Sequence, residues 1–339
     1  MVDQNPAQVW LNQVIETPID PDQRIIDPHH HLWRRPEDDY LIQDLWQDTS
    51  AGHRVMMTVF VECGAEYHTD GPEEARSLGE TAFVAKQAER SRDDSGQATI
   101  AGIVGRVDLR LPTATLVRLL DQHRAMGQGL FRGIRHAGAH ALYPETLTIP
   151  GRAPKDLYQD PDYRRGVQEL GRQNLTFDTW HYHYQNQDFI ALAQACPETL
   201  MVLDHFGTPL GVGPFKHQRE TIFAQWQRDM AVLAKTCPNV VAKLGGLAMP
   251  DNGFGWSERD RPASSDEFVS AQARYYHHMI DCFGSDRCMF ESNFPVDKRS
   301  ISYNTLYNGL KKIATDYSLD IKDQLFYGTA ARVYGLMES

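Results

Sequence analysis

The fold is decided by "RIIDPHHHLW", residues 24–33, in which a short apolar run leads into three consecutive histidines. Such a run is typical of a buried first strand. An open, doubly wound sheet would usually place a glycine-rich phosphate loop directly after this strand. No glycine follows until Gly52. The stretch therefore favours a closed barrel over the open sheet.

Seven more runs of the same kind follow along the chain, and they are continuously apolar rather than alternating. This pattern is typical of parallel strands that are buried on both faces. The predicted strands are 24–29, 54–63, 99–109, 131–136, 175–180, 200–207, 239–247 and 287–295.

Longer amphipathic segments separate these strands. The expected helices are 72–91, 113–126, 160–173, 188–196, 218–237 and 264–284, with two more after the last strand. Eight strands that alternate with helices predict a (β/α)8 TIM barrel. We expect residues 1–23 to form an N-terminal arm and residues 24–339 to form a single barrel domain.

Composition and charge narrow the class of protein. The chain has 339 residues and a net charge of −11, from 34 basic and 45 acidic residues, so a nucleic-acid partner is not expected. No apolar stretch reaches the roughly 20 residues of a membrane span. The first residues lack the features of a secretion signal, and the five cysteines have no CxxC spacing. We expect a cytoplasmic protein with no membrane partner, and a homo-oligomer remains open.

The histidines of the opening stretch are the first candidate site. Residues two apart on a strand point the same way, so His29 and His31 can both face the barrel mouth while His30 faces away. Two imidazoles at this spacing suit a divalent metal ion. The alternative is a pair of polar residues at a strand end that are satisfied by hydrogen bonds.

Other strand ends carry groups of the same kind, and barrel enzymes build their sites at these ends. Asp27 and Asp204 each precede a strand-end histidine and could orient it. The long loop 248–263 is a candidate substrate lid. The remaining candidates are Glu62, Arg135, His136, His181, His205, Trp256, Arg259 and Asp297.

Five motifs in order, "IIDPHHHLW", "FRGIRH", "VLDHFGTP", "VVAKLGGL" and "RCMFESNFPVD", resemble those of the amidohydrolase superfamily. The resemblance is to its amidohydrolase-2 branch, which holds 2-pyrone-4,6-dicarboxylate lactonase and sugar-lactone hydrolases, and it runs from about residue 24 to 336. It implies a distorted (β/α)8 barrel of the metal-dependent-hydrolase type, with the site at the carboxyl ends of the strands.

The same resemblance implies the site residues. The strand-one D-x-H-x-H motif maps onto Asp27, His29 and His31, and the strand-six histidine maps onto His205. The strand-eight aspartate maps onto Asp297, although Ser292 and Asn293 stand where many relatives have it. The carbamylated strand-four lysine of the superfamily's binuclear members has no counterpart here, which argues against a binuclear centre. One zinc or manganese ion bound by His29, His31, His205 and Asp297 is expected, and a metal-free mechanism stays open.

The chemistry implied is hydrolysis of a lactone by a water that a general base activates. Asp297 would be the base, and the three histidines would hold the metal or donate hydrogen bonds to the oxyanion. Arg135 would grip a substrate carboxylate, or else form a structural ion pair. His136, Glu62, His181, Trp256 and Arg259 would line the substrate site. The alternatives are a zinc-dependent non-oxidative decarboxylase of the same branch, with His181 or His183 as an extra ligand, and a non-catalytic binding barrel.

Overall fold

The computed structural model describes residues 6–36, 38–94 and 96–336. Eight strands form one sheet in the order β1 to β8, and every neighbouring pair is parallel. The predicted (β/α)8 barrel is therefore confirmed. The strands are β1 (Arg24–His30), β2 (Arg54–Val61), β3 (Thr99–Gly105), β4 (Phe131–Arg135), β5 (Thr176–Thr179), β6 (Met201–Leu203), β7 (Val240–Leu244) and β8 (Cys288–Phe290).

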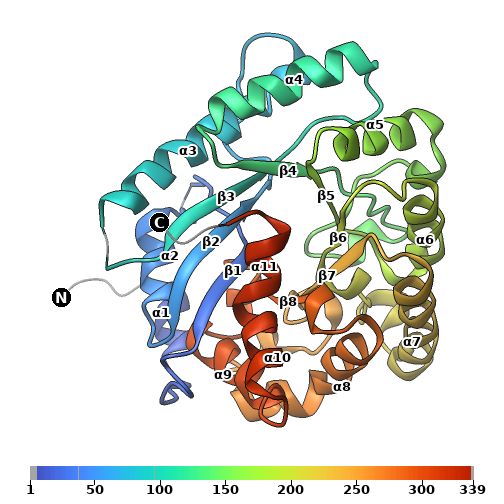
Figure 1. The fold of residues 1–339 in the computed structure, drawn as a ribbon. Coiled ribbons are helices and arrows are strands. Elements are labelled where there is room, and N and C mark those ends of the chain that lie inside the picture. The colour runs from blue at the N-terminus through green and yellow to red at the C-terminus, as the bar shows by residue number, and fades with distance from the viewer. Residues whose placement is uncertain (1–5, 37, 95, 337–339) are drawn as a thin grey trace.

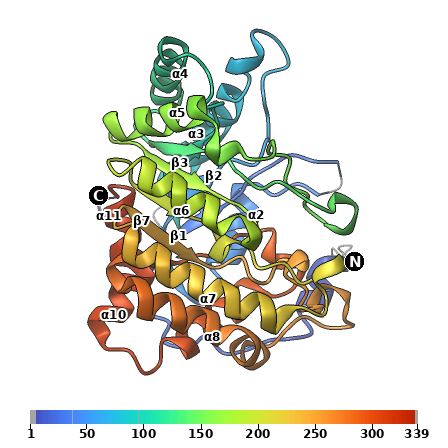
Figure 2. The same ribbon diagram turned by 90° about the vertical axis from the view of Figure 1, so that its right-hand side faces the viewer.

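The helices surround this barrel, as Figure 1 shows, and α6, α7 and α8 lie side by side along one flank (Figure 2). They are α1 (Pro6–Leu11), α2 (Ile42–Thr49), α3 (Leu78–Asp93), α4 (Thr113–Met126), α5 (Pro161–Arg172), α6 (Asn186–Ala195), α7 (Arg219–Thr236), α8 (Ser265–Phe283), α9 (Tyr303–Ile313), α10 (Leu319–Asp323) and α11 (Thr329–Val333). Helix α2 lies between the first two strands, where the sequence analysis above gives no expected helix. No helix of the described residues has the length and apolarity needed to cross a membrane.

The barrel is nearly closed, and its last contact is made beyond the end of β8. Within the described residues, β1 meets the segment that follows β8 through a parallel bridge between His30 and Phe294. The His31 N–H donates to the Phe294 carbonyl at 2.8 Å, and the Asn293 N–H donates to the His29 carbonyl at 3.0 Å. The segment that follows β8 therefore completes the barrel next to the predicted histidines.

The two faces of the strands pack in two different layers. Side chains that point inward form one apolar cluster, which includes Ile26, Val59, Val61, Val202, Val241 and Met289. Residues from the last helices join the same cluster, among them Tyr327, Val333 and Tyr334. The Arg24 guanidinium at the start of β1 lies 4.3 Å from the centre of the Tyr327 ring. The C-terminal helices thus cover the amino end of the barrel and leave the carboxyl end for a site.

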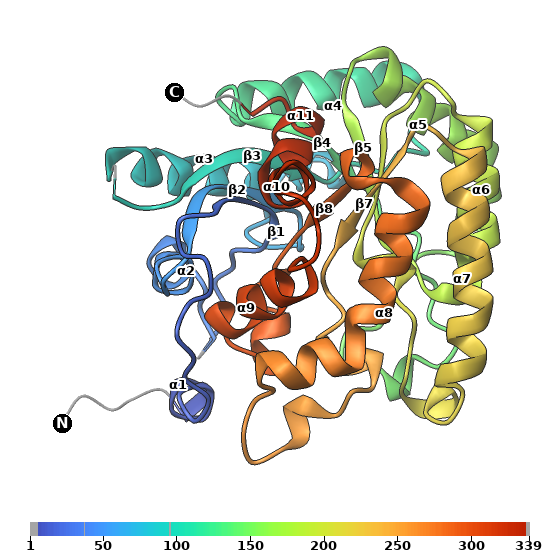
Figure 3. The same ribbon diagram turned by 60° about the horizontal axis from the view of Figure 1, so that its bottom comes forward.

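The N-terminal segment packs outside the barrel, against the helices after β7 and β8. The Glu16 carboxylate accepts hydrogen bonds from the Ser265 N–H at 2.8 Å and from the Ser265 hydroxyl at 2.6 Å. The Asn308 side chain donates to Glu16 at 3.0 Å. Figure 3 shows α1 at the periphery, away from the strands. The first five residues of the predicted arm lie outside the described residues.

Candidate active site

An irregularity in β1 decides which way its histidines point. Ile26 points into the barrel, so strict alternation would also turn residues 28 and 30 inward. The register with β2 shifts between Asp27 and His30, so that β1 has one extra residue here. His30 consequently faces outward, where its ring meets Phe60 and its Nε2 lies 3.0 Å from the Thr58 hydroxyl. His29 and His31 turn to the inside.

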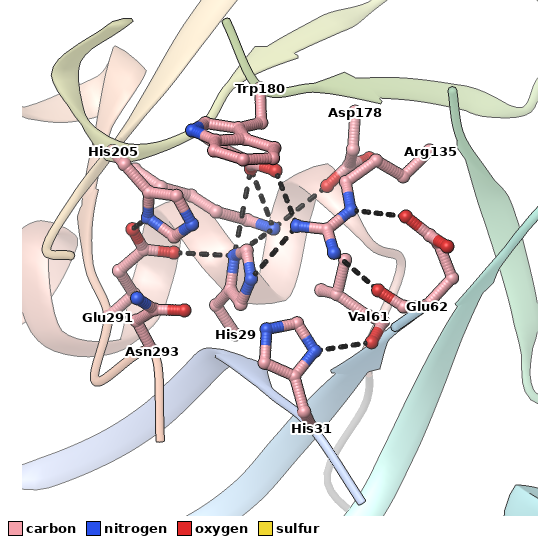
Figure 4. A network of polar contacts seen from close by, with 12 residues as sticks. His29, His31, Val61, Glu62, Arg135, Asp178, Trp180, His205, Glu291 and Asn293 are labelled. Carbon is pink, nitrogen blue, oxygen red and sulfur yellow. Dashed lines mark hydrogen bonds and ion pairs between the residues drawn. The ribbon is translucent and has the colours of Figure 1, made fainter. Parts of the chain in front are cut away.

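Three histidines meet at the carboxyl end of the barrel (Figure 4). The ring centre of His29 lies 5.0 Å from that of His31 and 4.5 Å from that of His205. All three side chains are buried. The structure therefore brings together His29, His31 and His205, which the sequence assigns to one site.

One carboxylate, Glu291, holds two of these histidines. Its Oε1 lies 2.7 Å from Nδ1 of His205, and its Oε2 lies 2.8 Å from Nδ1 of His29. Glu291 is not among the site residues predicted from the sequence. The alternation of side chains along β8 could have identified it, because Met289 points inward and Glu291, two residues further on, is expected to point the same way.

The contacts at Nδ1 leave Nε2 over in His31 and His205, whereas both ring nitrogens of His29 also lie 3.4 Å from a cation, Nδ1 from Lys243 Nζ and Nε2 from Arg135 Nη1. His31 Nδ1 lies 2.8 Å from the Val61 carbonyl oxygen, so all three Nδ1 atoms face an acceptor. A neutral histidine that donates from Nδ1 has its lone pair on Nε2. Metal-ligating histidines have this arrangement, in which the second ring nitrogen donates to a carboxylate or a backbone carbonyl. It is less suited to histidines that donate directly to an oxyanion.

Burial and neighbouring charges shift the pKa values of the cluster. Burial lowers the pKa of His29 well below its ordinary value, and burial together with Arg135 does the same for His31. Burial would also lower the pKa of His205, but Glu291 and Asp204 raise it above its ordinary value. Burial would raise the pKa of Glu291, but His205 and His29 bring it down to about 2. Glu291 is thus held as an anion.

Arg135 emerges from β4 beside His29 and is surrounded by groups of the protein itself. Its Nε donates to Glu62 Oε1 at 2.9 Å, and its Nη2 donates to the Glu62 carbonyl. Its Nη1 lies 3.4 Å from both Asp204 Oδ2 and His29 Nε2. Burial would lower the pKa of Arg135, but Glu62 and Asp204 raise it above its usual value. The guanidinium is engaged as in the ion-pair alternative of the sequence analysis.

A second buried cation, Lys243 of β7, lies below the histidines. Its Nζ is 2.8 Å from Asp178 Oδ2, 3.4 Å from Asp204 Oδ1 and 3.4 Å from His29 Nδ1. The Tyr334 hydroxyl donates to the same Asp178 oxygen at 2.5 Å. Burial opposes the charge of Lys243, yet Asp178 and Asp204 raise its pKa. This ion layer joins β5, β6 and β7 to the C-terminal segment. Asp178 and Tyr334 are not singled out by the sequence.

Asp297 is buried next to the strand-eight segment. Its Oδ1 accepts from Asn293 Nδ2 at 2.8 Å, and its Oδ2 accepts from the Ala248 N–H at 3.1 Å. Burial raises the pKa of Asp297 to about 7, although the charge of His205 works in the opposite direction. A carboxyl group with this pKa can exchange a proton near neutral pH. Its role as the base stays a prediction.

Asp27 of the D-x-H-x-H motif serves the barrel closure. Its Oδ1 accepts from the Ser292 N–H at 2.9 Å, and its Oδ2 accepts from the Tyr303 hydroxyl at 3.0 Å. The carboxylate thereby ties β1 to the segment after β8.

The chain that carries His205 adopts an uncommon backbone. Residues 205–208 all have positive φ angles, from 36° to 63°, and three of the four are not glycine. Such angles cost free energy and persist where surrounding contacts impose them. Gly246 packs directly against this turn, and a Cβ atom there would lie 2.3 Å from Nδ1 of His205. The "LGG" of strand seven thus makes room for the histidine ring.

Four residues predicted to line the site have their contacts elsewhere. His136 packs on Tyr163 and accepts from the Leu109 N–H at 3.2 Å. His181 lies 3.1 Å from the Asn186 side-chain oxygen and 3.2 Å from the Tyr158 hydroxyl. Trp256 is buried and stacks on Phe254, and Arg259 binds Glu267 at 2.6 Å. Their part in substrate binding stays a prediction.

Two histidines and one carboxylate form a donor set for a metal ion. His29, Asp204 and His205 each bring one nitrogen or oxygen atom to within 4.8 Å of the others. Asp204 Oδ1 is buried and accepts no hydrogen bond from a described residue. Imidazole nitrogens with a carboxylate oxygen suit zinc or manganese. These residues therefore fit a divalent metal. The predicted ligands His31 and Asp297 lie outside this compact set.

Comparisons with known proteins show which proteins this chain is similar to. The y4mH protein of Sinorhizobium fredii is 31% identical over 338 residues, covering 92% of this chain and 99% of that protein. L-fucono-1,5-lactonase of Burkholderia multivorans is 29% identical, covering 92% and 96%. A crystal structure of a Burkholderia multivorans amidohydrolase with bound zinc superposes with a TM-score of 0.70 at 26% identity, covering 92% and 99%.

A family model settles the classification. The model Amidohydro_2, described as Amidohydrolase, matches residues 26–336, which is nearly the whole barrel. The matched range begins within β1, just before the histidines, and ends just after α11. The expected family, fold and enzyme class are thereby confirmed, and this chain belongs to the amidohydrolase family of hydrolytic enzymes.

Proposed function

We propose that this enzyme opens a lactone, the cyclic ester of a small organic acid, by adding water. The observation that carries the proposal is the histidine cluster, in which three Nδ1 atoms are held by Glu291 and by the Val61 carbonyl. The Nε2 atoms of His31 and His205 have no hydrogen-bond partner among the described residues, and Nε2 of His29 lies 3.4 Å from Arg135 Nη1. A lactonase among the relatives and a zinc-containing crystal structure of the same family support the reaction and a metal in it.

The metal would be held by His29, His205 and Asp204, with His31 beside them. A divalent ion bound there would polarise the lactone carbonyl and lower the pKa of a bound water. The protein's own part is to orient the ligand histidines. Glu291 does this for two of them at once, because it contacts Nδ1 of both His29 and His205.

The proton transfers are assigned to Asp297. Its carboxylate takes a proton from the attacking water as the C–O bond to the carbonyl carbon forms. The ring C–O bond then breaks, and Asp297 returns the proton to the departing alkoxide, which leaves a hydroxy acid. Asn293 and the Ala248 N–H orient the carboxylate for this role. Its pKa of about 7 supports a group that both accepts and donates near neutral pH.

The substrate charge is left open by the geometry of Arg135. A carboxylated substrate would need the guanidinium, whose donors already face Glu62, Asp204 and His29. The proposal is therefore stated for lactones in general. Among the described residues, neither His181 nor His183 bonds to the three histidines of the cluster, and His183 Nδ1 accepts from the Leu210 N–H at 3.2 Å. No observation favours the decarboxylase alternative.

The test measures acid release from a panel of five- and six-membered lactones, together with carbon dioxide release and bound metal. We expect hydroxy-acid products, no carbon dioxide, and zinc or manganese in the purified protein. Asp297→Asn should lower kcat by about 100-fold or more without a comparable loss of Tm. Asp281→Asn, at an exposed position of α8, is the matched control and should leave kcat unchanged. Carbon dioxide release, or full activity of Asp297→Asn, would overturn the proposal.

A further inference from the structure

A cavity of about 580 Å³ lies at the amino end of the barrel, at the opposite end of the strands from the histidines. Its walls are the start of β4, the connections that lead into β5 and β6, and the C-terminal segment 332–335. Its volume is within the range of small-molecule sites. This cavity is therefore separate from the reaction site at the carboxyl end.

Two guanidinium groups line this cavity, and neither has a carboxylate partner among the described residues. Nη1 of Arg132 donates to the Gly129 carbonyl at 2.7 Å, and Nη2 donates to the Ala101 carbonyl at 3.3 Å. Nη2 of Arg332 donates to the Asp286 carbonyl. Backbone carbonyls are neutral groups, so both arginines keep a positive charge that no anion of the protein balances.

Arg132 is the more buried of the two arginines. Burial lowers its pKa, and no carboxylate offsets this effect. Its Nε is buried and has no hydrogen-bond partner among the described residues. A charge that is withdrawn from water costs free energy unless an opposite charge accompanies it. An anion in the cavity would supply that opposite charge.

The other polar groups of the cavity leave its positive charge in excess. Glu198 is the single carboxylate among the described lining residues, and it is exposed. Asn174 is also exposed, and its side-chain amide has no hydrogen-bond partner among the described residues. Two guanidinium groups thus stand against one carboxylate, in a chain whose net charge is −11. This local balance favours an anionic ligand.

The remaining walls of the cavity offer carbon surface. The Thr176 hydroxyl donates to Asp178 at 2.9 Å, and the Tyr334 hydroxyl donates to the same carboxylate at 2.5 Å, so both hydroxyls are engaged by the protein. Covering apolar surface stabilises a complex, and an organic anion covers these walls better than a bare inorganic ion does. The apolar lining residues are Phe131, Leu175, Leu200 and Val333.

We propose that this cavity binds the anion of a small organic acid. Its carboxylate would pair with Arg132 and Arg332, since the planar fork of a guanidinium matches a carboxylate. Its carbon skeleton would pack on the apolar walls. Such a ligand would contact Tyr334, whose hydroxyl holds Asp178 in the ion layer below the histidines. The binding does not depend on the proposed lactonase function, because the cavity lies at the other end of the barrel.

Calorimetry with three probes tests the site. Sodium benzoate carries a carboxylate on an apolar ring, benzamide keeps the ring without the charge, and inorganic phosphate keeps the charge without the ring. We expect a saturable isotherm for benzoate and at least 10-fold weaker binding of the other two probes.

Variants locate the bound benzoate. Arg132→Gln should weaken its binding by 10-fold or more, and Arg332→Gln should weaken it several-fold. Glu198→Gln removes the carboxylate that opposes the anion, so it should tighten binding several-fold. Arg332 and Glu198 are exposed, so these two variants keep the test valid if Arg132→Gln does not fold. Arg228→Gln makes the same change of charge at an exposed position of α7 outside the cavity and should leave the affinity unchanged.

The opposite shifts in Arg332→Gln and Glu198→Gln would support the organic-anion cavity, whether or not lactones are hydrolysed. Absence of benzoate binding, equal binding of benzamide, or tighter binding of phosphate would overturn it. Benzoate that binds the natural protein, Arg332→Gln and Glu198→Gln with one affinity would lie elsewhere and would overturn it as well. None of these results bears on lactone opening, which the product analysis tests separately.

Discussion

Glu291 gives each of its carboxylate oxygens to a different histidine, and this single side chain sets the orientation of both rings. Glu291→Gln keeps the volume but has only one acceptor oxygen, so one ring loses its partner. We expect kcat/KM to fall by about 10- to 100-fold, the usual effect of losing a group that orients a ligand histidine, with the fall mainly in kcat. Steady-state kinetics with bound-metal analysis checks this. Unchanged kinetics would mean that the histidines keep their orientation without the carboxylate.

Arg135 joins β2, β4 and β6 through Glu62 and Asp204. Arg135→Lys keeps the charge but cannot reach both partners with a planar fork. We expect a loss of about 1–3 kcal/mol in the free energy of unfolding and a lower kcat toward charged and uncharged lactones alike. Denaturant titration and kinetics with one lactone of each kind measure this. A loss confined to carboxylated lactones, at unchanged stability, would instead make Arg135 a substrate clamp.

At the scale of the elements, the sequence predicts each strand but not its end. The apolar runs of β6 and β8 continue into "DHFG" and "ESNFP", so the predicted strands extend several residues beyond those observed. These extra residues leave the sheet because they carry the site: the turn at 205–208 has positive φ angles, and the segment after β8 closes the barrel. The residues are buried in both places, so their hydrophobicity cannot distinguish a strand that is hydrogen-bonded in the sheet from an irregular buried segment.

Gly246 supports the turn at His205, and both its φ of +75° and its closeness to the ring exclude a side chain. Gly246→Ala should therefore displace His205 and lower kcat/KM by at least 10-fold, in addition to a backbone cost of about 1–3 kcal/mol. Gly129→Ala is the matched control, since its φ is +84° but nothing lies within 4 Å of the added methyl group. It should lose stability only. Equal kinetics for the two variants would contradict the steric argument.

At the scale of the whole molecule, two patterns account for what the sequence could predict. One is the repeat of apolar runs along the chain, and the other is the alternation of side chains between the two faces of a strand. The barrel follows from eight apolar runs, and the meeting of His29, His31 and His205 follows from the rule that strand ends share one face. Parity also separates Arg135, which points inward, from its neighbour His136, which packs on Tyr163. Side chains on long loops, such as Trp256, have no such rule, because their direction is set by packing that only the folded chain defines.

Glu80, at the start of α3, couples the global stability to pH. Its Oε1 accepts from the Cys63 N–H at 3.0 Å and from the Ala65 N–H at 2.8 Å, just after β2. Its Oε2 is buried and has no hydrogen-bond partner among the described residues. Burial, followed by the charge of Glu62, raises the pKa of Glu80 to about 8. The other titratable or charged groups that act on it or feel its charge are Cys63, Tyr67 and Arg135.

The folded protein therefore binds a proton at Glu80 that the unfolded chain releases near pH 4.3. The contribution of this proton to stability is complete below that pH and is lost as the pH rises toward about 8. Glu80→Gln is neutral at every pH and keeps an acceptor for the two N–H groups. Between pH 5 and 8, we expect the free energy of unfolding of the variant, relative to that of the natural protein, to rise by up to about 1.4 kcal/mol per pH unit.

Urea titrations at several pH values measure this difference. Glu89→Gln, at an exposed position of the same helix, should show no such trend. Parallel curves for Glu80→Gln and the natural protein would mean that Glu80 is ionised in the folded state.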